Sequence, residues 1–286
     1  AHDQYELCAS PCQIFDCFAF ERRLSDSAFM VHNDNILNEI AAVTAAIGAD
    51  EGLIQGAGGN SSIKIGDTLW VKASGAWMRD ALAKDIFVPA PLAAMREAAA
   101  RGDQAELDRL THSCAAPQGA RPSIEACLHA IMPQATVIHA HAVNATVCAA
   151  LSDGRERFAR AMSEAGIAAQ SAPYVKPGAA LAREVVRLLD EHGSADAILL
   201  ENHGIIVGAD SPAAAAAMLQ RVEAALSFPA RPVGGDDAEQ GRELESEAYE
   251  VAPEHNFAAC DAFLHSVITF APLTPDQVVF LGGAPG

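Results

Sequence analysis

The chain has 286 residues, half of them hydrophobic, and it carries a formal charge of −18 at pH 7. The length allows one large domain or two small ones, and no apolar run reaches about 18 residues, which argues against a membrane span. The negative charge argues against a general nucleic-acid binder, because phosphate backbones are bound through basic surfaces. It leaves room for a small phosphorylated substrate, which needs only a few local donors.

The cysteines and the N-terminus indicate a reducing cytoplasm. Cys8, Cys12 and Cys17 are spaced neither like the pairs of a zinc site nor like the usual iron–sulfur runs. Cys127 and Cys148 fall in apolar stretches, where small core residues are expected. The odd number of cysteines, together with an N-terminus that lacks a basic segment before an apolar run, predicts a cytoplasmic protein without a secretory signal.

Composition and periodicity suggest three segments. Residues 1–32 show no sustained period and are predicted to be an N-terminal arm or tail. Residues 33–230 alternate between helical and strand patterns and are predicted to form the main domain. Residues 231–286 begin within a linker-like stretch rich in glycine and are predicted to be a C-terminal extension that packs on the same domain, with one or two helices and a final strand at 278–281.

The first half of the main domain begins with a helix that Asn33 or Asp34 can cap and that Gly48 ends. A glycine-rich turn at 56–59 then leads into a predicted hairpin. The remaining elements expected in this half are the hairpin strands 62–65 and 68–73, a strand at 86–88, helices near 91–100 and 104–111, and a helix capped by Ser123 or a neighbour.

The second half continues the alternation of strands and helices. Its expected elements are a strand at 135–140, helices at 143–151 and 156–165, a strand at 172–175, a helix after Gly178 that ends at Gly193, a strand pair at 197–200 and 205–207, and a helix opened by Ser211 and Pro212. The alternation predicts a layered α/β domain. The hairpins imply that its sheet is mixed or antiparallel in part.

Two histidines on one predicted strand suggest a metal site. His139 and His141 are two residues apart, so their side chains share a face of the strand, about 6–7 Å from each other. Two imidazoles at this spacing can bind one divalent ion if a third ligand arrives from elsewhere, and His203 is the candidate. Three histidines with one open position are typical of catalytic zinc. The alternative is a pair of hydrogen-bonded histidines in a buried strand.

The helix that precedes this strand carries a candidate base. Glu125 is expected in its first turn, where a carboxylate suits the helix dipole, and it could act as a base beside the metal. His129 lies one turn further along. It could be a fourth ligand, but we favour a residue that orients Glu125 or packs in the core.

Several polar residues could form an anion site. The glycine-rich turn does not have the pattern of a nucleotide-binding phosphate loop. The neutral groups that could converge around an oxyanion belong to Gly59, Asn60, Ser74, Gly75 and Ser123. The helix N-terminus expected at Ser123 would add a favourable dipole, although a turn or a cap explains each residue taken alone. Lys72 could supply a positive charge, or it could be a solvated lysine on the strand.

Together these motifs resemble the class II aldolase/adducin family over about residues 36–227. The motifs are Gly59-Asn60-Ser61-Ser62, Ser74-Gly75, Ser123-Ile124-Glu125 with His129, His139-Ala140-His141 and Asn202-His203-Gly204. The stretch 69–75 is most similar to the branch that holds the aldolase half of two-domain rhamnulose-phosphate aldolase/dehydrogenase proteins. No dinucleotide-binding fingerprint follows, so we expect the dehydrogenase half to be absent.

The resemblance implies a three-layer α/β/α domain with a central mixed, largely antiparallel sheet. It also implies a homotetramer with active sites at subunit interfaces. By position, His139, His141 and His203 would bind zinc or another divalent transition metal, and Glu125 would be the acid/base residue. The implied ligands of the substrate phosphate are Gly59, Asn60, Ser74, Gly75 and Ser123. Lys72 stands where the related enzymes carry an uncharged residue, which suggests a different anion or a different placement of it.

The implied function is that of a zinc-dependent aldolase. Such an enzyme cleaves a ketose phosphate reversibly to dihydroxyacetone phosphate and an aldehyde through a metal-stabilised enediolate. The alternatives are a decarboxylase or epimerase of a phosphorylated sugar or sugar acid, and a non-enzymatic adducin-like interaction domain. The tyrosine that serves the aldehyde end in the fuculose-phosphate enzyme has no counterpart between Leu151 and Gln170, so the donor on the aldehyde side stays open.

Overall fold

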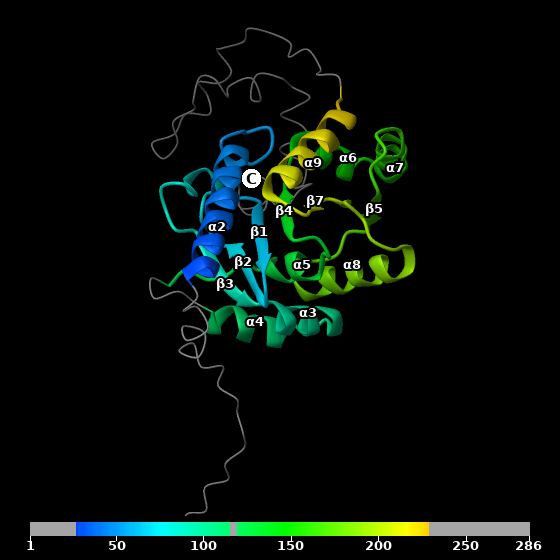
Figure 1. Ribbon diagram of the computed structural model, residues 1–286. Coiled ribbons are helices and arrows are strands. Elements are labelled where there is room, and N and C mark those ends of the chain that lie inside the picture. Colours follow the sequence, from blue (N-terminus) through cyan, green and yellow to red (C-terminus); the bar gives the residue numbers. More distant parts are fainter. Residues whose placement is uncertain (1–26, 115–118, 229–286) are drawn as a thin grey trace, which may run out of the picture. The chain divides into compact units, whose positions relative to one another are not determined.

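The computed structural model describes residues 27–114 and 119–228 (Figure 1). The chain divides into two compact units, residues 1–38 and 39–286. Helix α2 (Ser27–Gly48) begins in the first unit and ends in the second. It starts before the cap predicted at Asn33 or Asp34, because no glycine or proline interrupts the chain between its first residue and Gly48. The domain boundaries stay a prediction. Residues 1–26, with the three N-terminal cysteines, and the C-terminal extension lie outside the described residues.

In the described part of the chain the second unit contains a seven-stranded sheet with the strand order β3-β2-β1-β4-β7-β6-β5. Its strands are β1 (Asn60–Ile65), β2 (Thr68–Lys72), β3 (Phe87–Pro91), β4 (Thr136–Ala140), β5 (Ala169–Ala172), β6 (Ala197–Leu200) and β7 (Gly204–Ala209). All neighbours are antiparallel except β5 and β6, which are parallel. The prediction of a mixed, largely antiparallel sheet is therefore confirmed.

Helices cover both faces of the sheet (Figure 1). One face packs against α3 (Leu92–Arg101), α4 (Gln104–Ser113), α5 (Ala126–Ile131) and α8 (Ala179–His192). The other packs against α6 (Val143–Ala150), α7 (Gly154–Glu164), α9 (Pro212–Ala225) and the C-terminal end of α2. None of the helices in the described ranges has the length and apolar character needed to cross a bilayer.

Strand alternation decides which side chains enter which layer. In β4, Val137 belongs to the core under α3, α5 and α8, and Ile138 belongs to the core under α6, α7 and α9. Because successive strand residues point to opposite faces, His139 lies on the same side as Val137, the side that carries α5. This register brings the candidate metal ligand and the candidate base into the same layer.

Several predicted elements are confirmed, and a few boundaries were wrong. The β1–β2 hairpin, the β6–β7 pair, the end of α8 at Gly193 and the cap of α9 by Ser211, which accepts a hydrogen bond from Ala214 N at 3.3 Å, are as predicted. Strand β5 ends at Ala172 rather than beginning there, because Pro173 has no amide hydrogen to donate. The short helix η1 (Met78–Asp80) was not predicted.

Candidate metal and acid–base site

The three predicted histidines meet where β4 ends and β7 begins. His139 is the fourth residue of β4, His141 follows that strand, and His203 directly precedes β7. All three are buried, and one ligand nitrogen from each lies within 4.8 Å of the others. The ring centroids are 4.8–5.3 Å apart. The alternative of two histidines that only hydrogen-bond within a strand does not describe this three-ring cluster.

His139 directs its unprotonated ring nitrogen, Nε2, toward the centre of this cluster. Its Nδ1 lies 3.0 Å from the carbonyl oxygen of Ile205, which can only accept, so Nδ1 carries the proton. Burial lowers the pKa of His139 to about 3, so the ring is neutral at working pH. Its unprotonated Nε2 then faces His141 Nε2 at 3.1 Å and Glu125 Oε2 at 3.4 Å.

A lone pair that faces a carboxylate at this distance is unfavourable unless a cation lies between them. Glu125 Oε1 and His203 Nδ1 are also buried without a hydrogen-bond partner among the described residues, although Oε1 lies 3.1 Å from His203 Nε2. Three imidazoles form a donor set suited to zinc and its neighbours in the first transition row. The residues present therefore fit a divalent metal ion.

Glu125 is held beside the cluster as a carboxylate. It is 8 % exposed and occupies the N-cap position of α5. Burial alone would raise its pKa, but the imidazoles of His139 and His203 hold the pKa of Glu125 well below its usual range. The helix begins at Ala126, so the prediction that Ser123 or a neighbour caps it was wrong by two residues relative to Ser123, and Glu125 is the N-cap rather than a residue of the first turn. The Ser123 hydroxyl instead accepts a hydrogen bond from Glu125 N at 3.3 Å.

A directed chain of hydrogen bonds ends at this carboxylate. Burial lowers the pKa of His129 to about 3, so its ring is neutral and one nitrogen donates while the other accepts. Its Nε2 donates to Asn60 Oδ1, and its Nδ1 accepts from the hydroxyl of Ser62 at 2.7 Å. The amide nitrogen of Asn60 then donates to Glu125 Oε2 at 3.0 Å. His129 is thus outside the three-ring cluster and is linked to Glu125 through Asn60, which agrees with the preferred prediction that it orients the candidate base.

Ser62 was named in a motif but given no role. The signal was present in the sequence, because Asn60 and Ser62 share one face of β1 by strand alternation. What the sequence lacks is the partner, since His129 Nδ1 meets Ser62 across 67 positions of the chain.

Part of the predicted anion site is brought together. Asn60 Nδ2 lies 3.2 Å from Ser123 Oγ, and Ser123 N donates to the carbonyl oxygen of Lys72 at 3.2 Å. Ser74 N donates to the carbonyl oxygen of Arg121 at 2.8 Å, which ties the turn after β2 to the segment that leads to Ser123. Ser74 and Gly75 are exposed. Because the amides of Ser74 and Ser123 are already used, these two residues have only their hydroxyls left for an anion.

Glycine is required at two positions beside the cluster. Gly59 has a positive φ of 62°, and a Cβ there would lie 2.9 Å from the carbonyl oxygen of His139. A Cβ on Gly204 would lie 2.6 Å from the carbonyl oxygen of Ala140 and 3.1 Å from His141 Cδ2. The absence of a side chain at Gly59 and Gly204 therefore lets the backbone at these positions lie close to β4.

Lys72 is not the solvated lysine that was the alternative. Its side chain is 2 % exposed, and its ammonium donates to the carbonyl oxygens of Ala57 at 3.2 Å and Ala76 at 2.6 Å. Burial lowers its pKa to about 8. The ammonium therefore lies between the glycine-rich turn and the turn that carries Ser74 and Gly75.

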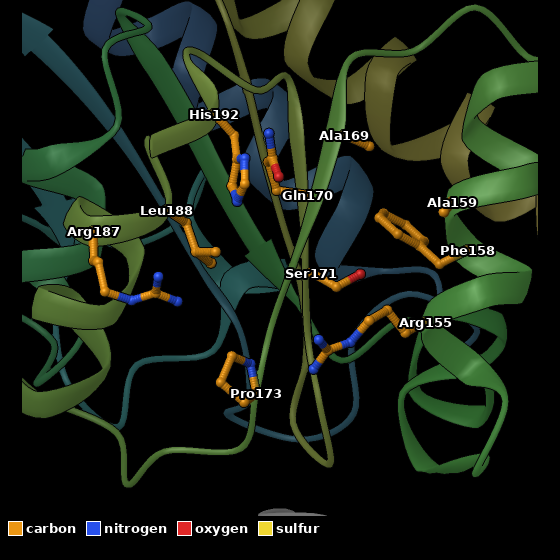
Figure 2. Close-up of a pocket in the computed structure, with 10 residues that line it drawn as sticks. All are labelled: Arg155, Phe158, Ala159, Ala169, Gln170, Ser171, Pro173, Arg187, Leu188 and His192. Carbon is orange, nitrogen blue, oxygen red and sulfur yellow. The ribbon is translucent and has the colours of Figure 1, made fainter. Parts of the chain in front are cut away.

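A separate cavity of about 460 Å³ lies between α7, β5 and α8 (Figure 2). Arg155 and Arg187 line it, but Arg155 pairs with Glu201 at 2.5 Å and Arg187 pairs with Glu184 at 2.6 Å. Because both arginines already have carboxylate partners and none of the three clustered histidines lines this cavity, it is not part of the candidate site.

Comparisons with known proteins agree with the geometry. The family model described as the class II aldolase and adducin N-terminal domain matches residues 38–228. An uncharacterized oxidoreductase of Bacillus subtilis, YuxG, is 28 % identical over 182 residues, which are 59 % of this chain and 26 % of that protein. The chain therefore spans about a quarter of the length of this curated relative.

Solved structures share the fold. The N-terminal class II aldolase domain of a conserved protein from Thermoplasma acidophilum has a TM-score of 0.56 and 25 % identity, covering 67 % of this chain and 93 % of that one. A sugar-phosphate aldolase from Thermotoga maritima has a TM-score of 0.50 and 16 % identity, covering 68 % of this chain and 93 % of that one. At these identities the second likeness shows the fold alone.

Proposed function

The chain belongs to the class II aldolase and adducin family, and from this premise we propose that it is a zinc-dependent aldolase that cleaves a ketose phosphate reversibly to dihydroxyacetone phosphate and an aldehyde. The observation that carries the proposal is the buried cluster of three histidine nitrogens with the Glu125 carboxylate 3.1 Å from His203 and 3.4 Å from His139. A purely binding, adducin-like domain does not need a buried carboxylate beside three clustered imidazoles.

In this proposal His139, His141 and His203 hold the metal, and the metal when bound supplies positive charge that stabilises the enediolate left by carbon–carbon cleavage. Glu125 moves the proton on the enediolate carbon. Its Oε2 is fixed by Asn60 at 3.0 Å, and its Oε1 has no hydrogen-bond partner among the described residues. One carboxylate oxygen is thus anchored, and the other is left to exchange a proton.

We assign the substrate phosphate to the polar groups beside Glu125. The proposed ligands are Gly59, Asn60, Ser74, Gly75 and Ser123. Support comes from the contact between the side chains of Asn60 and Ser123, and from the exposed turn at Ser74 and Gly75, which is tied to the Ser123 segment through Arg121. The sugar-phosphate aldolase that shares this fold has a substrate of the proposed class.

We further propose that the enzyme is a cytoplasmic homotetramer with active sites at subunit interfaces. Val143, Val147 and Leu151 lie one turn apart along α6 and its end, and they are 49 %, 42 % and 40 % exposed. Such a stripe of apolar side chains supports burial against a neighbouring subunit. Light scattering of the purified chain tests the assembly: a mass of four chains is expected, and a monomer at all concentrations contradicts it.

The function is tested on the purified full chain by metal analysis followed by incubation with a panel of ketose phosphates. We expect about one zinc per chain and release of dihydroxyacetone phosphate from at least one sugar. A decarboxylase or epimerase of a phosphorylated sugar or sugar acid would use the same cluster, so the products distinguish the reactions. Carbon dioxide or an epimer, without carbon–carbon cleavage into two carbonyl compounds, contradicts the aldolase.

A further inference from the structure

Lys72 carries a buried charge that the proposed chemistry does not use. Its ammonium has two hydrogen bonds, both to backbone carbonyl oxygens, those of Ala57 and Ala76. Within the described part of the chain no carboxylate forms an ion pair with it, and Glu125 acts on it only at longer range. A buried charge without a close partner is costly, so its presence calls for a function.

The register of the sheet shows that Lys72 does not point toward the catalytic carboxylate. Val71 packs in the core under α3, α5 and α8, and Val137 of β4 packs in the same core. By strand alternation Lys72 points to the opposite face, whereas His139 lies on the face of Val137. Lys72 contacts Ala57 and Ala76, and the nearby residues Ile54 and Met78 belong to the core on that opposite face.

The two carbonyl groups belong to the two turns that supply the proposed phosphate ligands. Ala57 is in the turn that ends at Gly59 and Asn60, and Ala76 directly follows Ser74 and Gly75. A single ammonium thus donates hydrogen bonds to both turns. Hydrogen bonds from a charged donor are stronger than neutral ones, which suits a group that fixes two glycine-containing turns.

We propose that Lys72 is a positioning residue of the anion site, whose ammonium ties the two phosphate-binding turns together and adds positive charge beneath them without touching the substrate. The inference rests on the proposed function only in assigning the anion to a sugar phosphate. It predicts that loss of the ammonium weakens binding of a phosphate group while the metal site stays intact.

The experiment compares Lys72→Met with Lys64→Met in the full chain. Lys64 is the matched control, because it is partly buried, also donates to a backbone carbonyl oxygen, that of Gln134 at 2.5 Å, and also has a pKa lowered by burial, to about 7. It lies at the other end of the hairpin, opposite Leu69. Calorimetry measures the affinity for inorganic phosphate, and metal content, thermal midpoint and amide hydrogen exchange are measured in parallel.

Lys72→Met is expected to weaken phosphate binding at least about tenfold and to speed amide exchange in residues 56–59 and 74–76. Its metal content should stay unchanged, and its thermal midpoint should stay the same or rise, which a merely structural role would not produce. Lys64→Met should keep the phosphate affinity. If Lys72→Met is recovered only as unfolded protein, Lys72→Gln is measured in its place with the same expected loss.

Equal phosphate affinity in the Lys72 variant and the unaltered chain overturns the inference, as does an unaltered chain that binds no phosphate. Both outcomes can be distinguished from a failure of the proposed function, because phosphate binding and aldol cleavage are measured independently. A chain that binds phosphate through Lys72 but releases no dihydroxyacetone phosphate supports the inference and contradicts the aldolase.

Discussion

Asn60 on β1 donates its side-chain amide to Glu125 Oε2 at 3.0 Å, across 65 positions of the chain. The same side chain accepts from His129 Nε2, so one amide joins the Glu125 carboxylate to a buried neutral histidine. The orientation of the proposed base is therefore decided on two elements, β1 and α5.

Replacing Asn60 tests this link. Asn60→Ala removes the donor of Glu125 and the acceptor of His129, so exchange of the dihydroxyacetone phosphate C3 proton should slow by about 10–100-fold, as expected when a charge-assisted hydrogen bond at a general base is lost. Metal content should not change. Ser61→Ala is the matched control, because Ser61 is the next residue of β1 and its hydroxyl contacts Thr44 instead. Equal slowing in both variants would show that the effect is a general disturbance of β1.

Glu125→Gln removes the proposed base while keeping its shape. Because general acid–base catalysis contributes typically about 10²–10⁴-fold, proton exchange at C3 should fall by that range. The three histidines are unaltered, so bound metal should remain. The measurement is deuterium uptake into dihydroxyacetone phosphate, with metal content determined on the same sample. Exchange that persists at the original rate assigns the base to another group.

His203→Ala should lose most of the bound metal, because it removes one of three imidazoles from the cluster. His112→Ala is the control: His112 is an exposed histidine on α4 that contacts the carbonyl oxygen of Asp108 and the side chain of Arg121. Elemental analysis after dialysis should find metal in the control and little in His203→Ala. Full occupancy in His203→Ala excludes it from the ligand set.

Lys64, the partly buried lysine of β1, predicts a pH dependence of stability. Burial lowers the pKa of Lys64 to about 7 from 10.5, so between these values the unfolded chain binds more protons than the folded one. The stability contributed by this group therefore rises with pH across that window, and the ammonium destabilises the fold below pH 7. Lys64→Met should raise the free energy of unfolding by about 1–3 kcal/mol at pH 6.5, and the gain should shrink toward pH 10. A gain that is constant with pH contradicts the assignment.

Much of this fold could be predicted from strand alternation and helix caps, because these patterns depend only on residues that are close together in the chain. Period-two spacing placed His139 and His141 on one face, and Ser211 before Pro212 predicted the start of α9. The start of α5 could not be read in this way, because the Ser123 hydroxyl binds Glu125 N and Asn60 instead of capping the helix.

Tertiary partners explain the other differences. Lys72 was judged by its strand alone, whereas its burial follows from two turns that close over it at Ala57 and Ala76. The sequence could not decide whether His129 is a metal ligand or a supporting residue, because its partners Ser62 and Asn60 lie on β1, far away in the chain. The sequence pattern predicts which chemical groups are present, and the register between strands determines which of them come into contact.

In the proposed site, His139, His141 and His203 bind one divalent ion beside Glu125. X-ray absorption at the zinc edge of the purified full chain tests it most directly. We expect about one zinc per chain with three nitrogen ligands at about 2.0–2.1 Å and the scattering pattern of imidazole. A chain that binds no metal from zinc-containing buffer, or a spectrum without imidazole ligands, would contradict it.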